Sequence, residues 1–193
     1  MQASDSSFTP TEIVNLLRLI NTRDDRNIRL ALAICEGGGD LPAELLKKIS
    51  SEPGLILYCL EEGHQKILSA FRFIYIRWSS LSAIPPNIKY LQNVLMLDFG
   101  YNKISEIHKN LYTLTQLKKL RFHKNQLHQI SPEIADLIYL EELDLSANFI
   151  ERLPTEINHL QQLKKLILTD NPLDAKQIDS LSIHLPNTCI VFG

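Results

Sequence analysis

Residues 117–127 read LKKLRFHKNQL and residues 140–150 read LEELDLSANFI, with the same spacing of apolar residues around one asparagine. The same frame recurs at 94–104 and at 163–173, so the asparagines follow one another at intervals of 23 residues. These asparagines are Asn102, Asn125, Asn148 and Asn171. Frames that keep one phase over this distance indicate an internal repeat, and this repeat decides the fold.

The spacing predicts a short strand followed by a turn in each repeat. Two apolar residues one position apart point to the same face of a strand, and polar residues alternate with them. The asparagine side chain both donates and accepts hydrogen bonds, so in the turn it can satisfy backbone groups of its own coil and of the next. A fifth frame, 71–81, carries Ser79 in the asparagine position, where we expect it to do part of this work.

The second half of each repeat is also regular. Apolar residues recur five, nine and twelve positions after the asparagine, as at Ile130, Ile134 and Leu137. A proline opens this half at Pro85, Pro132 and Pro154. Proline fits a turn or the first position of a helix, where its missing N–H costs little. We therefore expect an outer wall of short 3₁₀ or α turns.

These frames resemble the leucine-rich repeat family, and in particular its 23-residue type with an LPxxI segment such as 153–157. That type is similar to repeats of bacterial cytoplasmic proteins and of Ras-suppressor-type proteins. The resemblance covers residues 71–193. It implies an α/β fold, a leucine-rich repeat solenoid with a parallel β-sheet on its concave, protein-binding face. It also implies that catalytic residues are absent.

The chain is expected to divide at residue 70. Residues 1–70 lack the period, and we expect them to form an α-helical N-terminal cap, because the first coil of a solenoid would otherwise expose its apolar layer. The alternative is an independent effector or docking domain. The five expected repeats span 71–93, 94–116, 117–139, 140–162 and 163–185. A helix and a cap strand at 189–192 are then expected to close the solenoid.

Helix signals are clear within the N-terminal segment. Thr9, Pro10 and Glu12 form a capping box with proline at the first helical position. We expect Thr22 and Asp25 to open a second helix, and Asp40 and Pro42 to open a third. Residues 54–70 are expected to continue as helix.

The composition is ordinary for a globular protein. The chain has 193 residues, 45% hydrophobic content and a net charge of −2, so it can form a core and has no charge bias toward nucleic acid or membranes. Its start lacks the basic and apolar stretches of a signal peptide. The scattered cysteines Cys35, Cys59 and Cys189 are a poor disulfide framework. We expect a cytoplasmic protein without nucleic-acid or membrane partners, monomeric or self-associating.

No catalytic constellation is visible in the sequence. The positions of the histidines within the repeats place His123 on the concave side and His108, His128 and His159 on turns or the outer wall. Because these histidines do not come together, we expect neither a metal nor a cofactor. Cys35 or Cys59 beside His64 could be imagined as a nucleophile pair, but no motif supports it. The chain is therefore not expected to be an enzyme.

The expected concave face carries aromatic and then basic side chains on its first three strands. By repeat phase, the outward residues of interest are Phe73, Tyr75, Arg77, Trp78, Tyr101, Arg121, His123 and Lys124. Aromatic residues and arginine are enriched in interface hot spots, so this set is the predicted partner-binding surface. Two alternatives stand beside it. The aromatic residues could pack against the N-terminal helices, and the basic ones could be solvated charge balanced by an acidic strand with Glu142 and Asp144.

The sequence thus favours a non-catalytic scaffold or adaptor that binds a protein partner through its concave face. The alternative is a regulatory or targeting component of an enzyme or secreted effector system.

Overall fold

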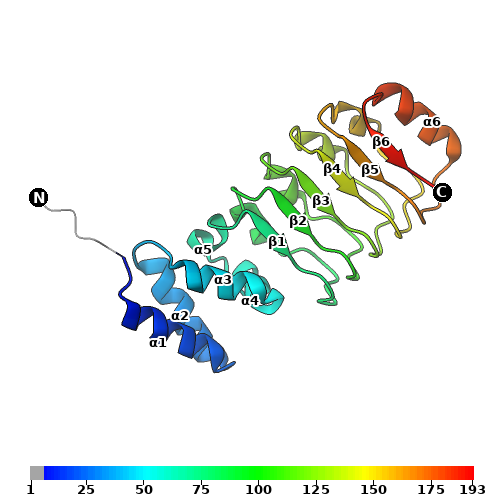
Figure 1. The fold of residues 1–193 in the computed structure, drawn as a ribbon. Helices are drawn as coiled ribbons and strands as arrows, with labels where there is room; N and C mark the ends of the chain where they lie inside the picture. Colours follow the sequence, from blue (N-terminus) through cyan, green and yellow to red (C-terminus); the bar gives the residue numbers. More distant parts are fainter. Residues whose placement is uncertain (1–6) are drawn as a thin grey trace, which may run out of the picture.

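A computed structural model describes residues 7–193. Helices at the N-terminal end lead into a curved stack of coils, and one further helix lies at the C-terminal end (Figure 1). Residues 1–6, on which the signal-peptide expectation and the first part of the expected cap fall, lie outside the described residues.

The strands form one parallel sheet in chain order. They are β1 (Phe73–Tyr75), β2 (Met96–Asp98), β3 (Lys119–Arg121), β4 (Glu142–Asp144), β5 (Lys165–Ile167) and β6 (Cys189–Val191). From β1 to β5 the register equals the repeat, so that Leu97 pairs with Leu120, and Leu120 pairs with Leu143. This confirms the α/β solenoid with a parallel sheet, and β6 adds the expected last strand.

Short 3₁₀ helices form the wall opposite the sheet. They are η1 (Pro86–Tyr90), η2 (Lys109–Thr113), η3 (Pro132–Asp136) and η4 (Thr155–His159). The expectation of short turns is confirmed. Each 3₁₀ helix directs at least one apolar residue, such as Ile134, into the core behind the strands.

The asparagines tie each coil to the one before it. The Nδ2 group of buried Asn125 donates to the carbonyl oxygens of Phe99 (2.9 Å) and Phe122 (3.0 Å), and its Oδ1 accepts from the N–H of Ile104 (3.0 Å). Asn102, Asn148 and Asn171 make the equivalent bonds. We call these four side chains the asparagine ladder.

Ser79 does part of this work, as expected, but its side chain does not tie two coils together. Its hydroxyl donates to the carbonyl of Arg77 within its own turn (3.1 Å). The Oδ1 atom of Asn102 instead accepts from the N–H groups of Ser79 (3.0 Å) and Leu81 (3.2 Å). Helices, and not another coil, precede this first repeat, so the hydroxyl bonds within its own turn.

The helices are α1 (Pro10–Asn21), α2 (Asp25–Gly37), α3 (Ala43–Ser51), α4 (Pro53–Glu62), α5 (Gln65–Ser69) and α6 (Ala175–His184). The capping box of Thr9 and Glu12 is confirmed. Asp24, rather than Thr22, caps α2 with its side chain. The expected helix over 54–70 is interrupted, because Gly63 adopts φ 79° and ends α4. Within residues 7–193 no helix is both long and apolar enough to cross a membrane.

One hydrophobic cluster runs through helices and coils alike, from Leu16 in α1 to Leu185 after α6. Both α4 and α5 contact η1, so they lie against the first coil. The division at residue 70, and the role of the helices as a cap, stay predictions.

A polar junction fixes the entry of the chain into β1. The carboxylate of Glu36, near the end of α2, accepts from the N–H groups of Lys66 (3.2 Å) and Ile67 (3.0 Å) at the start of α5. The ammonium of Lys66 donates back to the carbonyl of Cys35 (3.1 Å). Each helix therefore supplies a side chain that bonds free backbone groups at the end of the other, and α5 is held where the first strand begins.

We predict that Asn125→Ala lowers the free energy of unfolding by about 1–3 kcal/mol for each buried backbone group that it leaves unpaired. Asn171→Ala, at the less buried end of the ladder, should cost less because water can replace the amide. Thermal unfolding of both variants measures the difference. An unchanged melting temperature for Asn125→Ala would show that the ladder does not stabilise the fold.

Candidate interaction surface

The structure brings the predicted site residues together over three adjacent coils. Phe73 and Tyr75 lie on β1 and are 54% and 44% exposed. Trp78 follows β1 and is 70% exposed. The N-terminal helices therefore leave these three side chains partly in solvent, although Phe73 and Tyr75 lie across a hollow from α3.

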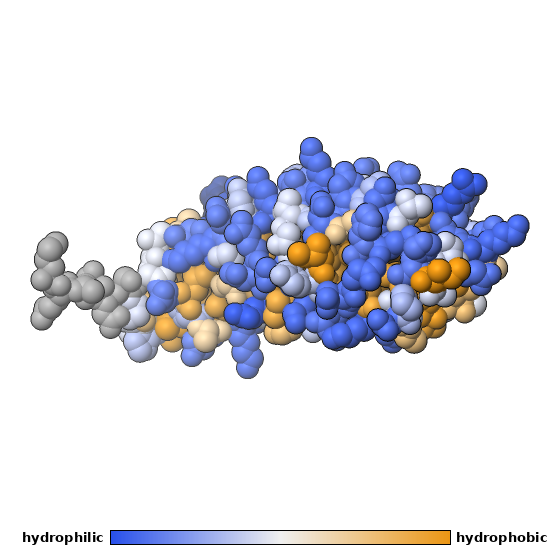
Figure 2. Space-filling model, turned by 90° about the horizontal axis from the view of Figure 1, so that it is seen from above, coloured by the Kyte–Doolittle hydropathy of each residue, from blue (hydrophilic) through white to orange (hydrophobic). Residues whose placement is uncertain are grey.

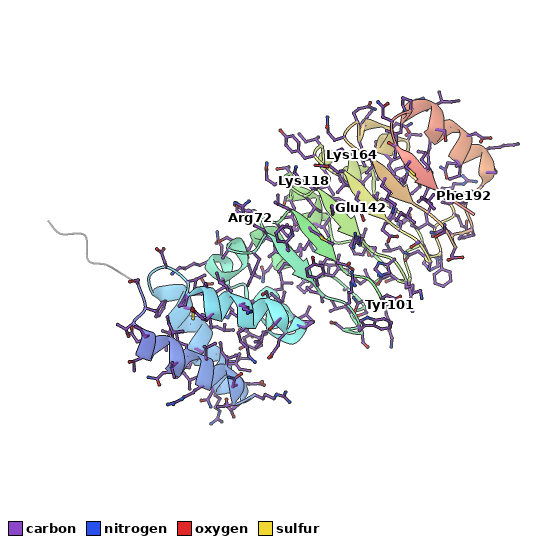
Figure 3. All side chains as sticks on the ribbon, viewed as in Figure 1. Arg72, Tyr101, Lys118, Glu142, Lys164 and Phe192 are labelled. Carbon is purple, nitrogen blue, oxygen red and sulfur yellow. The ribbon has the colours of Figure 1, made fainter. Side chains whose placement is uncertain are left out.

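Trp78, Tyr101 and Lys124 lie in the turns after the strands and not on the strands themselves. Figure 3 shows Tyr101 at the rim where the strands end. The residue that precedes the asparagine position has φ between 52° and 59° in all five repeats. We call this set the left-handed column, and its members are Trp78, Tyr101, Lys124, Ala147 and Asp170.

A positive φ is unusual for bulky residues and costs of the order of 1 kcal/mol or more. Because the conformation recurs in every repeat, the turn imposes it, and the type of side chain has little part in it. The column therefore leaves its side chains free to vary. Sequence reasoning missed it, and the only available signal was the fixed position before each asparagine.

The first three members of the column form a continuous stack. The rings of Trp78 and Tyr101 are stacked with centroids 3.6 Å apart, and the Lys124 ammonium lies 4.7 Å from the centroid of Tyr101. The ring of His123 meets Tyr101 edge-on at 5.0 Å. Stacking and cation–π contacts hold these side chains in place before any partner binds.

Beside this stack, the concave face holds a buried carboxylate. Asp98 on β2 has no exposed surface, accepts a hydrogen bond from Arg77, and lies 3.7 Å from Arg121. Its other oxygen accepts from the N–H of Gly100 (3.0 Å). Burial acts to raise the pKa of Asp98, but the bonds from Arg77 and Gly100 outweigh it and hold that pKa below its usual value.

The basic and acidic strands are joined directly. The Nε and Nη2 atoms of Arg121 donate to Oε1 of Glu142, at 2.9 and 2.7 Å, and Lys119 pairs with the same carboxylate at 3.2 Å. The expectation of solvated charge balanced by the next strand is thus only partly right. Charges alternate from Arg77 through Asp98 and Arg121 to Glu142, so the guanidinium groups are fixed in position.

Gly100 makes room for His123. A Cβ atom at position 100 would lie 2.1 Å from Cε1 of His123, so any other residue would displace the imidazole ring. The ring lies over the end of β2, with Nδ1 3.8 Å from a carboxylate oxygen of Asp144. This close approach keeps His123 against Tyr101.

The described residues contain no group of three or more side chains able to bind a metal ion. The suggested thiol nucleophiles are also unsuited to attack. Burial raises the pKa of Cys35 to about 11 and that of Cys59 to about 12, so both stay protonated at neutral pH.

We predict that Asp98→Asn lowers the free energy of unfolding at pH 7 by about 1–3 kcal/mol, because Arg77 loses a charged partner. Since folding lowers the pKa of Asp98, its contribution is complete above the unfolded value of about 3.9 and is lost as the pH falls through the folded value. In urea unfolding, the gap between the variant and the wild type should therefore narrow as the pH falls from 7 toward 3.

Asp144→Asn, in the same register on β4, is the matched control. Its Oδ1 accepts from the N–H of Ser146, and an asparagine oxygen can keep that bond. An equal loss of unfolding free energy for Asp98→Asn at pH 7 and at pH 3 would contradict the negative charge assigned to Asp98 in the folded protein.

Comparisons with known proteins agree with this architecture. A family model described as leucine rich repeat matches residues 115–173. No curated protein matches the chain. Among solved structures, the chain is similar to a leucine-rich repeat protein of Leptospira interrogans. That match has 28% identity and a TM-score of 0.61, over 69% of this chain and 33% of that one.

Two further structures share the fold alone. An internalin of Listeria monocytogenes has 24% identity and a TM-score of 0.57, over 67% of this chain and 37% of that one. The ectodomain of the receptor kinase GASSHO1/SCHENGEN3 from Arabidopsis thaliana was solved in complex with Casparian strip integrity factor 2. It has 24% identity and a TM-score of 0.55, over 66% of this chain and 19% of that one.

The chain spans about a third of the length of the first two of these structures. The family match, the structural likeness and the parallel sheet together identify the fold of this chain as a leucine-rich repeat solenoid.

Proposed function

We propose that this chain is a non-catalytic scaffold or adaptor that captures a protein partner on the concave face over β1 to β3. The binding surface comprises Phe73, Tyr75, Arg77, Trp78, Tyr101, Arg121, His123 and Lys124. The observation that carries the proposal is the 70% exposure of Trp78 while its ring is stacked on Tyr101.

Two physical arguments support this assignment. Large aromatic side chains left in water lose the stabilisation of burial, and a partner can restore it on binding. The stack with Lys124 and the ion pairs of Arg77 and Arg121 already restrict these side chains, so binding needs little further ordering.

The partner surface should combine apolar and acidic groups. Apolar groups would cover Trp78 and Tyr75, and a carboxylate would meet the cation of Lys124. The face seen from above in Figure 2 is largely hydrophilic, with hydrophobic side chains in separate small areas. The predicted surface itself offers a few exposed aromatic anchors, Phe73, Tyr75 and Trp78.

We also infer a monomer that works in the cytoplasm, with repeats of the 23-residue type found in bacterial and Ras-suppressor-type proteins. The four five-residue 3₁₀ helices of the outer wall support the repeat type. The free, buried thiols of Cys35 and Cys59 suit a reducing compartment.

The proposal predicts that Trp78→Ala combined with Tyr101→Ala abolishes partner capture. Hot-spot aromatic residues contribute about 2 kcal/mol each, or roughly 30-fold in affinity. Affinity capture from the native lysate, followed by titration of the captured protein, measures the loss. The melting temperature should change little, because Trp78 is exposed.

Phe149→Ala is the matched control, since Phe149 is an aromatic residue 52% exposed on a later coil and stacked on His128. It should leave capture unchanged. A partner that the double variant still binds with wild-type affinity would refute the assignment of the surface.

A further inference from the structure

The first strand of the sheet has an unpaired edge. In a parallel pair, alternate residues of a strand direct their backbone groups to one neighbour, and the residues between them face the other side. The N–H of Ile76 donates to the carbonyl of Asp98 (2.8 Å), and the carbonyl of Arg72 accepts from the N–H of Met96 (3.2 Å). The backbone groups of Phe73 and Tyr75 therefore point away from β2.

These groups have no partner within residues 7–193, where no hydrogen bond to the backbone of Phe73 or Tyr75 is formed on that side. The inner strands show what is missing. In β2, Met96 and Asp98 bond to the preceding strand, whereas the N–H of Phe99 donates to Arg121 in the next coil (2.9 Å). Phe73 and Tyr75 occupy the positions of Met96 and Asp98, and they lack a preceding strand.

A hollow of about 450 Å³ lies along this edge, between α3 and β1. Its lining includes Leu46 and Ser50 from α3, and Phe71, Phe73 and Tyr75 from the segment around β1. The hollow therefore offers apolar walls next to free backbone donors and acceptors. These are the two components that hold an added strand at a sheet edge.

The hollow is also cationic. Lys47 of α3 and Arg72 at the start of β1 both line it, and no acidic residue does (Figure 3 labels Arg72). Neither forms an ion pair with any residue in the described part of the chain. This differs from the inner face, where Arg77 and Arg121 are already paired. An acidic segment would complement the two free cations.

We propose that the edge of β1 receives an extended peptide segment in which apolar and acidic residues alternate. The segment adds a strand beside Phe73 and Tyr75, and its carboxylates meet Lys47 and Arg72. This inference rests on the proposed function, because Phe73 and Tyr75 belong to both surfaces. It specifies how one stretch of the partner is held.

A second copy of the chain is the competing occupant, since β6 is the other outer strand of the sheet. Because α3 forms the opposite wall of the hollow, a folded solenoid that approached the edge of β1 would meet this helix. A single extended segment requires less width, which favours it as the occupant.

The probe is a blocked octapeptide that alternates glutamate and valine, titrated into the full chain by calorimetry. Two further peptides carry N-methyl groups, one at every valine and one at every glutamate. Successive N–H groups of a strand point to opposite edges, so the valine N–H groups face one edge and the glutamate N–H groups the other. One of the two methylated peptides should therefore bind at least about tenfold more weakly than the parent peptide, while the other retains its affinity. Equal binding of all three would overturn the proposal.

Variants of the protein test the same edge from the other side. Proline is tolerated on an edge strand whose N–H faces outward, so Phe73→Pro should keep the pairing of β1 with β2 and remove one free donor. It should bind the parent peptide about fivefold or more weakly than Phe73→Ala, which also lacks the ring. Lys47→Glu should weaken binding of the parent peptide more at low salt than at high salt, because salt screens the charge interaction.

Trp78→Ala with Tyr101→Ala separates this inference from the proposed function. The double variant should still bind the peptide, because the edge of β1 is intact, even where capture of the whole partner is lost. Concentration-dependent dimers in sedimentation that Phe73→Pro abolishes, together with no peptide binding, would assign the edge to a second copy and overturn the proposal.

Discussion

The asparagine side chain in each turn is the constraint on which the rest of the structure depends. Its amide group donates to carbonyl oxygens of two successive coils, and its oxygen accepts from an N–H of the earlier coil, as Asn125 does for Phe99, Phe122 and Ile104. An apolar side chain could not satisfy these buried backbone groups. The ladder therefore sets the distance and the phase between coils, and the parallel sheet follows from it.

The same turn determines what the molecule displays. The residue before each asparagine is held at positive φ, and in the first two repeats that residue is aromatic. Trp78 and Tyr101 are thereby stacked at the rim, next to a concave face whose charges are paired in alternation from Arg77 to Glu142. A regular scaffold thus presents an irregular set of side chains, and the choice of partner lies in that set.

Much of the fold could be predicted because its signals are local and repeated. The strands, the 3₁₀ wall and the capping box at Thr9 depend on spacing and residue type. The left-handed column could not be predicted in this way, because tryptophan, tyrosine and lysine carry no preference for positive φ. The open edge of β1 could not be predicted from the sequence either, since it depends on which backbone groups face β2. From the sequence, Trp78 could be either exposed or packed against the N-terminal helices. The choice depends on where these helices lie, and the sequence pattern does not determine that.

The most direct test of this account is the fluorescence of Trp78, the only tryptophan of the chain. If the turn displays this residue to solvent, iodide should quench its emission nearly as well as it quenches N-acetyl-tryptophanamide, and the emission should lie close to that of indole in water. A blue-shifted emission that iodide does not quench would mean that Trp78 is buried, and would contradict the account of the concave surface.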